Sequence, residues 1–157
     1  MDAPDDKKQD LLVYYKTQSI TDDCTAIGAG WATCTSVKLT TKTIETLVSV
    51  LEADIRIKSR QSFVIVPVTF TSFPTVDSSA VTREHTIRLS GEYRVGGKKG
   101  NQGIKQGIKC VTFVIRTPMT IAILNWMVGE VEKTLKKDLG VTRVSFIPIQ
   151  FCEIDST

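Results

Sequence analysis

Apolar side chains recur at regular spacings along most of the 157-residue chain, and these spacings predict its elements. Residues 31–41 are rich in β-branched side chains, which is typical of a strand. Thr43 is an expected N-cap for a helix that follows this strand. Apolar positions of that helix recur at i, i+3, i+4, i+7 and i+11, the pattern of an amphipathic helix; they are Ile44, Leu47, Val48, Leu51 and Ile55.

The middle of the chain predicts three further strands. Residues 62–73 form an apolar run interrupted by Pro67, which cannot donate a hydrogen bond to a ladder, so we expect an edge strand or a bulge there. From residue 84 onward His85, Ile87 and Leu89 alternate with polar side chains, as in a half-exposed strand. Residues 108–116 predict another strand.

A second helix and a last strand complete the pattern. Thr117 and Pro118 are typical of a helix start, and Gly140 is typical of its end at about residue 139. The lysines of its C-terminal part complement the helix dipole, and they are Lys133, Lys136 and Lys137. Residues 141–152 predict a strand that contains Pro148.

This order of elements predicts an α+β fold: a single domain with a mainly antiparallel sheet packed with two amphipathic helices. We expect residues 1–23 to be an acidic, flexible N-terminal arm and residues 24–157 to be the domain. No repeat with a period of 20–50 residues is evident.

The arm carries one apolar patch, which predicts a docking segment. We expect it to mediate self-association, with docking on its own domain as the alternative. The patch consists of Leu11, Leu12, Val13, Tyr14 and Tyr15.

Composition narrows the class of protein. No apolar run approaches the length of a membrane span, and the polar N-terminus lacks the pattern of a signal peptide, so we expect a cytosolic origin. The 4 cysteines are far apart and contain no CxxC pair, and the chain has 1 histidine. This spacing favours free thiols over structural zinc, and we expect neither a metal nor a cofactor.

Charge is distributed unevenly along the chain. Residues 1–23 contain six aspartates and three lysines, a net charge of −3, whereas residues 83–116 contain eight basic residues and two glutamates, a net charge of +6. This asymmetry suggests an anionic partner for the middle of the chain, or pairing between its two charged regions.

The basic residues concentrate in the segment 93–110, which has five glycines and no acid and which we expect to be a long strand-to-strand loop. A solvated hairpin tip is the plain interpretation. Lysine-rich surfaces also bind phosphates of nucleic acid or lipid by charge alone. The expected anion-binding residues are Arg94, Lys98, Lys99, Lys105 and Lys109.

Catalytic motifs are weak in this sequence. Gly91 and Gly96 have the spacing of a phosphate-binding loop, but Gly97 stands where its lysine belongs. A histidine-dependent nucleophilic site would have to use His85, and a lone strand histidine is more often a packed residue. We therefore expect that the protein is not an enzyme.

The segment VKLT (Val37–Thr40), the helix after it and the apolar strand Phe63–Phe70 resemble the core of rhabdovirus matrix proteins. The strand CVTFVI and the segment PMTIAILNWM (Pro118–Met127) are similar to a strand and helix near the C-terminal part of that core. The resemblance is an ordered pattern over residues 31–150, and the short chain suits the plant-infecting branch. The chain departs from the family in its acidic arm and in lacking PPxY and PTAP motifs.

This resemblance implies a viral structural protein of the virion and host cytoplasm, attached peripherally to membrane. Such a protein self-associates and bridges the viral nucleoprotein–RNA complex to an anionic membrane surface. The alternative hypothesis is a small viral RNA-binding protein, such as a silencing suppressor or a movement factor. Self-association and liposome binding would favour the first hypothesis, whereas RNA binding by a monomer would favour the second.

Overall fold

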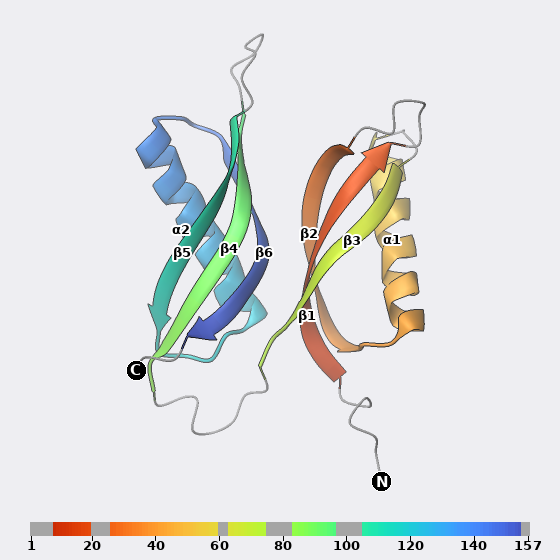
Figure 1. The fold of residues 1–157 in the computed structure, drawn as a ribbon, viewed down its shortest axis with the longest axis horizontal. Coiled ribbons are helices and arrows are strands. Elements are labelled where there is room, and N and C mark those ends of the chain that lie inside the picture. Colours follow the sequence, from red (N-terminus) through yellow and green to blue (C-terminus); the bar gives the residue numbers. More distant parts are fainter. Residues whose placement is uncertain (1–7, 20–25, 60–62, 75–82, 97–104, 155–157) are drawn as a thin grey trace. The chain divides into compact units, whose positions relative to one another are not determined.

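The computed structural model describes residues 8–19, 26–59, 63–74, 83–96 and 105–154. These residues form six strands and two helices, and the chain divides into two compact units, Met1–Ser72 and Phe73–Thr157. Each unit contains one three-stranded antiparallel sheet and one helix (Figure 1).

In the first unit, strand β1 (Lys8–Ser19) lies at the centre of its sheet. It pairs antiparallel with β2 (Ala26–Lys38) on one side and with β3 (Phe63–Ser72) on the other. Helix α1 (Thr41–Ser59) packs against β3 and covers one face of this sheet (Figure 1). The described side chains of α1 are all half-buried or exposed, so this helix packs loosely.

The N-terminal arm differs from the prediction, because residues 8–19 form the central strand of a sheet. Four consecutive side chains of the expected docking patch are at most 2% exposed, namely Leu11, Leu12, Val13 and Tyr14, and Tyr15 is half-buried. Apolar side chains in a central strand are removed from water by their strand neighbours and by the elements packed on the sheet. This patch is therefore part of the fold and is not an exposed surface for a neighbour.

In the second unit, strand β4 (His85–Val95) lies at the centre. It pairs antiparallel with β5 (Lys105–Ile115) and with β6 (Val144–Ile154). Helix α2 (Ile121–Leu139) covers one face of this sheet (Figure 1). Its buried stripe follows the helical period and faces the core; it consists of Leu124, Met127, Val128, Val131 and Leu135.

The two units share one topology, although the sequence shows no repeat with a period of 20–50 residues. Both run strand, strand, helix, strand, and in both the first strand is central. The register also shifts at equivalent places: Tyr15 pairs with Pro67, Gly91 pairs with Pro148, and the shift lies beside each pair. The two prolines therefore mark the same bulge in β3 and β6, as the sequence had led us to expect of Pro67.

Both helices begin at a threonine other than the expected one. The Thr40 hydroxyl accepts a hydrogen bond from the Thr43 amide (3.2 Å), and Thr120 does the same for Ile123 (3.2 Å). Gly140 ends α2 as expected, in the left-handed conformation at φ 65°. The fold prediction is confirmed as α+β with antiparallel strands and two helices, although the strands form two sheets instead of one.

Candidate functional site

The basic segment is a hairpin whose strands extend further than the sequence suggested. β4 continues to Val95 and β5 begins at Lys105, so much of the expected loop is paired strand. Lys98 and Lys99 lie outside the described residues. Of the expected anion-binding residues, the structure therefore describes Arg94, Lys109 and the backbone of Lys105.

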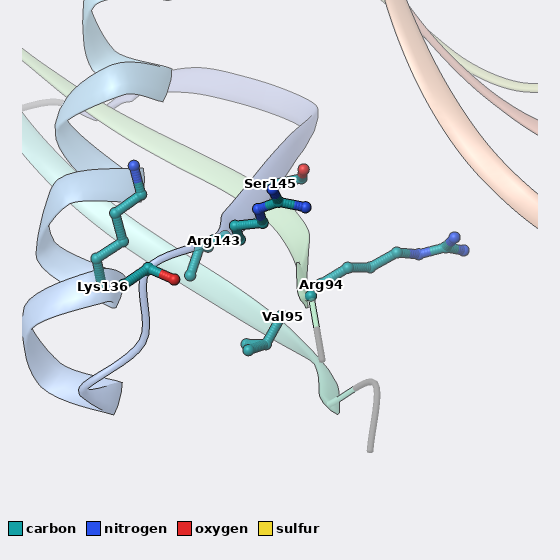
Figure 2. Close-up of a pocket in the computed structure, with 8 residues that line it drawn as sticks. Arg94, Val95, Lys136, Arg143 and Ser145 are labelled. Atoms are coloured by element: carbon teal, nitrogen blue, oxygen red, sulfur yellow. The ribbon is translucent and has the colours of Figure 1, made fainter. Parts of the chain in front are cut away.

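Arg94 lines a surface pocket of about 520 Å³ together with two cations from elsewhere in the second unit. Figure 2 shows Lys136 on α2, Arg143 just before β6, Ser145 near the start of β6, and Arg94 near the end of β4. We call this the cationic pocket. The described residues that line it are Arg94, Val95, Gly96, Lys136, Thr142, Arg143, Val144 and Ser145.

Local structure explains why these three residues line one pocket. Gly140 turns the chain after α2, so the residues that follow pass beside the last turn of the helix, where Lys136 lies. The Val141 amide donates a hydrogen bond to the Lys136 carbonyl oxygen (3.1 Å), and the Gly96 amide donates to the Arg143 carbonyl oxygen (3.2 Å). These two bonds hold the turn against both the helix and the end of β4.

The pocket is electropositive, because the described residues that line it include three basic side chains and no carboxylate. The Nε atom of Arg94 is buried and has no hydrogen-bond partner among the described residues. The C-terminus of α2 carries a negative partial charge, which Lys136 and Lys137 in the last turn offset. The helix dipole accounts for the position of Lys136, but it does not account for Arg94 and Arg143.

The cations spread outward and do not converge on one point. In Figure 2 the Arg94 side chain extends away from α2, whereas Lys136 stands on that helix. Two residues with hydroxyl side chains, Thr142 and Ser145, also line the pocket. This arrangement suits a ligand with several negative charges in a row better than a single small anion.

The structure does not bring all the expected basic residues to this pocket. Lys109 lines a different groove of about 370 Å³ between β5 and α2, where Glu130 is also found. The backbone of Lys105 pairs with Val95 next to Arg94. Arg88 and Arg94 lie on one face of β4, because the register between β4 and β5 runs without a shift.

Sequence reasoning missed Arg143, and it assigned Lys136 only to the helix dipole. The available signal was the short segment between Gly140 and the last strand, which contains Arg143. A turn that short must lie close to the helix end. Only the pairing of β6 with β4 places that turn beside Arg94, because Arg94 and Ser145 are partners in the register.

His85, the side chain that a histidine-dependent enzyme would need, is 4% exposed. Its Nδ1 atom contacts Oε1 of Glu153, and the Nη1 atom of Arg83 lies 3.9 Å from the same oxygen. His85, at the start of β4, therefore lies in a cluster with Arg83 and with Glu153, which is near the end of β6. It is not among the residues that line the cationic pocket.

The described cysteines are free thiols in different settings. Cys110 and Cys152 are exposed, whereas burial raises the pKa of the Cys34 thiol. Among the described residues, no three histidine, cysteine, aspartate or glutamate side chains cluster as metal ligands would. Within the same ranges, neither helix has the length and apolar character needed to cross a membrane.

Comparison of the chain with protein-family models, with curated protein sequences and with solved structures finds no match. The class is therefore defined by the fold and the pocket: an α+β protein of two units with equivalent topology, in which the second unit carries a cationic pocket.

Proposed function

We propose that the protein is a non-enzymatic viral RNA-binding protein that holds the phosphate backbone of RNA in the cationic pocket. The observation that carries this proposal is that Arg94, Lys136 and Arg143 line one pocket and that no carboxylate is found among its described lining residues. Guanidinium groups and hydroxyls donate hydrogen bonds to phosphate oxygens, and backbone contacts of this kind need no particular base sequence.

RNA fits this pocket better than a lipid surface does. Proteins that insert into membranes place large apolar side chains beside their basic residues. None of the exposed large apolar side chains among the described residues lines the cationic pocket. The lining residues that the structure describes also include no aromatic platform for stacking, so we expect binding with little sequence preference.

A wider role as a matrix-like protein is the second candidate. In that role the protein would self-associate, bind the nucleoprotein–RNA complex and contact an anionic membrane. Support for it comes from the regular, exposed edge of β5, which offers a surface for association. The docking patch in β1 no longer supports it, since those side chains are buried.

The test compares two double variants that remove the same charge. Arg94→Ala/Arg143→Ala removes two cations from the pocket, whereas Arg116→Ala/Lys133→Ala removes two exposed cations that lie beside carboxylates. Binding to a short fluorescent poly(U) RNA is measured by anisotropy at about 50 to 200 mM salt. We expect about tenfold weaker binding by the pocket variant and a salt slope lower by about 1.4, or 0.7 for each lost phosphate contact.

The control variant should keep nearly the whole salt slope of the unchanged protein. Equal losses in both variants would contradict the proposal, because net charge alone would then explain binding. Vesicles of phosphatidylcholine with and without phosphatidylserine form the second arm of the test. Binding to anionic vesicles in the absence of RNA binding would overturn the RNA proposal and favour the membrane contact of a matrix-like protein.

A further inference from the structure

The two sheets have four edges among the described strands, and three of them are irregular. β3 and β6 each contain a proline beside a register shift. β2 pairs with two register shifts and includes Ser36 at φ 53°. Prolines, bulges and breaks of this kind prevent an edge strand from pairing with another chain.

β5 is the exception. Its 11 residues contain no proline and pair with β4 without any register shift. None of the other described strands pairs with its outer side, because the sheet order is β5-β4-β6. A long, regular edge strand presents unpaired backbone groups that another strand can use.

The side chains of this edge are unusually apolar for a surface. Ile108 is 68% exposed and Val114 is 62% exposed, and both lie on the face of the sheet opposite α2. On the helix side, Trp126 is 52% exposed and its ring lies edge-on to Phe113, with ring centroids 5.8 Å apart. Large apolar groups beside an open edge are typical of a contact surface.

We propose that β5 pairs antiparallel with β5 of a second copy of this chain, with the two-fold axis at Val111. The two three-stranded sheets then form one six-stranded sheet with both α2 helices on the same face. This inference is independent of the RNA-binding proposal, because no residue of β5 lines the cationic pocket.

The sequence of β5 is complementary to itself in this register. An axis at Val111 places Ile108 opposite the partner's Val114, so the two most exposed apolar side chains of the strand cover each other. It also places Lys109 opposite the partner's Phe113, a cation next to an aromatic ring. In this register no charged residue of β5 lies opposite a residue of the same charge in the partner's β5. A two-fold interface has to be complementary to itself in this way.

Neighbouring registers are poorer. An axis at Lys109 would place two lysines directly opposite each other, which is destabilising. An axis at Cys110 would place Ile108 opposite the partner's Thr112 and Val114 opposite the partner's Gln106, so both exposed apolar side chains would face polar ones. The same argument favours a second copy over an unrelated strand, because both members of each apolar pair come from this one segment.

The test measures oligomeric state by sedimentation equilibrium at about 1 to 100 μM protein. We expect a dimer for the unchanged protein and at least about tenfold weaker dimerisation for Ile108→Lys, which places a charge against the partner's Val114. Adding Val114→Glu to that variant should restore the dimer, because each new lysine then lies opposite a new glutamate only in the register centred on Val111.

Val50→Lys is the matched control, because Val50 is 61% exposed but lies on α1. It should leave the dimer unchanged. A monomeric unchanged protein, or a double variant as weak as Ile108→Lys alone, would overturn the proposal. Circular dichroism of each variant confirms that the fold is kept.

A disulfide provides a second readout of the register. The Thr112→Cys variant places a new thiol opposite the partner's Cys110, within reach of a bond across an antiparallel pair. Mild oxidation should yield covalent dimers of this variant, and Cys110→Ser in addition should abolish them. Equal cross-linking with and without Cys110 would refute the register centred on Val111.

Discussion

At the scale of single residues, Gly91 shows how closely β4 and β6 approach. A Cβ atom at this position would lie 2.5 Å from the carbonyl oxygen of Ile147 and 2.5 Å from the Phe146 ring. The Phe146 ring occupies the space that the Cβ atom of any residue other than glycine would need. The extra residue at the neighbouring register shift belongs to the β6 partner, next to Pro148.

We expect Gly91→Ala to lower the free energy of unfolding by about 2 kcal/mol, because the added methyl forces a backbone oxygen and a ring apart. Gly129→Ala is the matched control, since a Cβ atom there meets nothing within 4 Å. In the interior of α2 it should raise the free energy of unfolding by about 0.5 to 1 kcal/mol. Urea unfolding of both variants measures the difference, and equal effects would contradict this explanation.

At the scale of elements, local sequence patterns predicted both helices but not the residues at which they begin. Thr117 followed by Pro118 matches the pattern of a helix start. The structure selects Thr120, whose backbone is extended and whose hydroxyl accepts the Ile123 amide hydrogen bond. Met119 just before it is 2% exposed, so packing of the preceding segment decides between the two positions.

We expect Thr120→Ala to destabilise the protein by about 1 kcal/mol, because the first turn of α2 loses the partner of one amide. Thr117→Ala, at the exposed position expected from the sequence, should change stability by less than about 0.5 kcal/mol. Thermal unfolding followed by circular dichroism measures both. A larger effect at Thr117 would mean that the helix starts where the sequence suggested.

At the scale of the whole molecule, the two units have one topology but different surfaces. The register pairs Gln18 with Val64 in the first sheet, at the place where Arg94 pairs with Ser145 in the second. The position of the basic residue Arg94 in the second unit is therefore occupied by the neutral residue Gln18 in the first unit. The cationic pocket is a property of the second unit and not of the shared topology.

We expect residues 73–157 alone to fold and to bind poly(U) RNA with about the affinity of the full chain. The whole lining of the pocket lies in that unit, as do the five buried side chains of α2. Residues 1–72 alone should bind at least about tenfold more weakly. Anisotropy with each fragment measures this difference, and stronger binding by residues 1–72 would place the RNA site outside the pocket.

Much of the secondary structure could be predicted from the sequence, because local signals dominate it. The apolar period of both helices, Gly140 as a helix end and the bulge at Pro67 all depend on neighbouring residues. The arm was mispredicted for a physical reason: a polar, acidic start resembles a flexible tail, but strand pairing with β2 and β3 depends on distant residues.

By itself the sequence determined the class of fold, the element types and the uneven charge, because each follows from composition or from short-range periodicity. Only the tertiary structure decided that LLVYY lies in a central strand with most of its side chains buried, and that Arg94, Lys136 and Arg143 line one pocket. The three basic residues lie in separate parts of the chain. The antiparallel register of β4 with β6 and the turn after α2 place them around the same pocket. That register is set by long-range pairing, which no local pattern specifies.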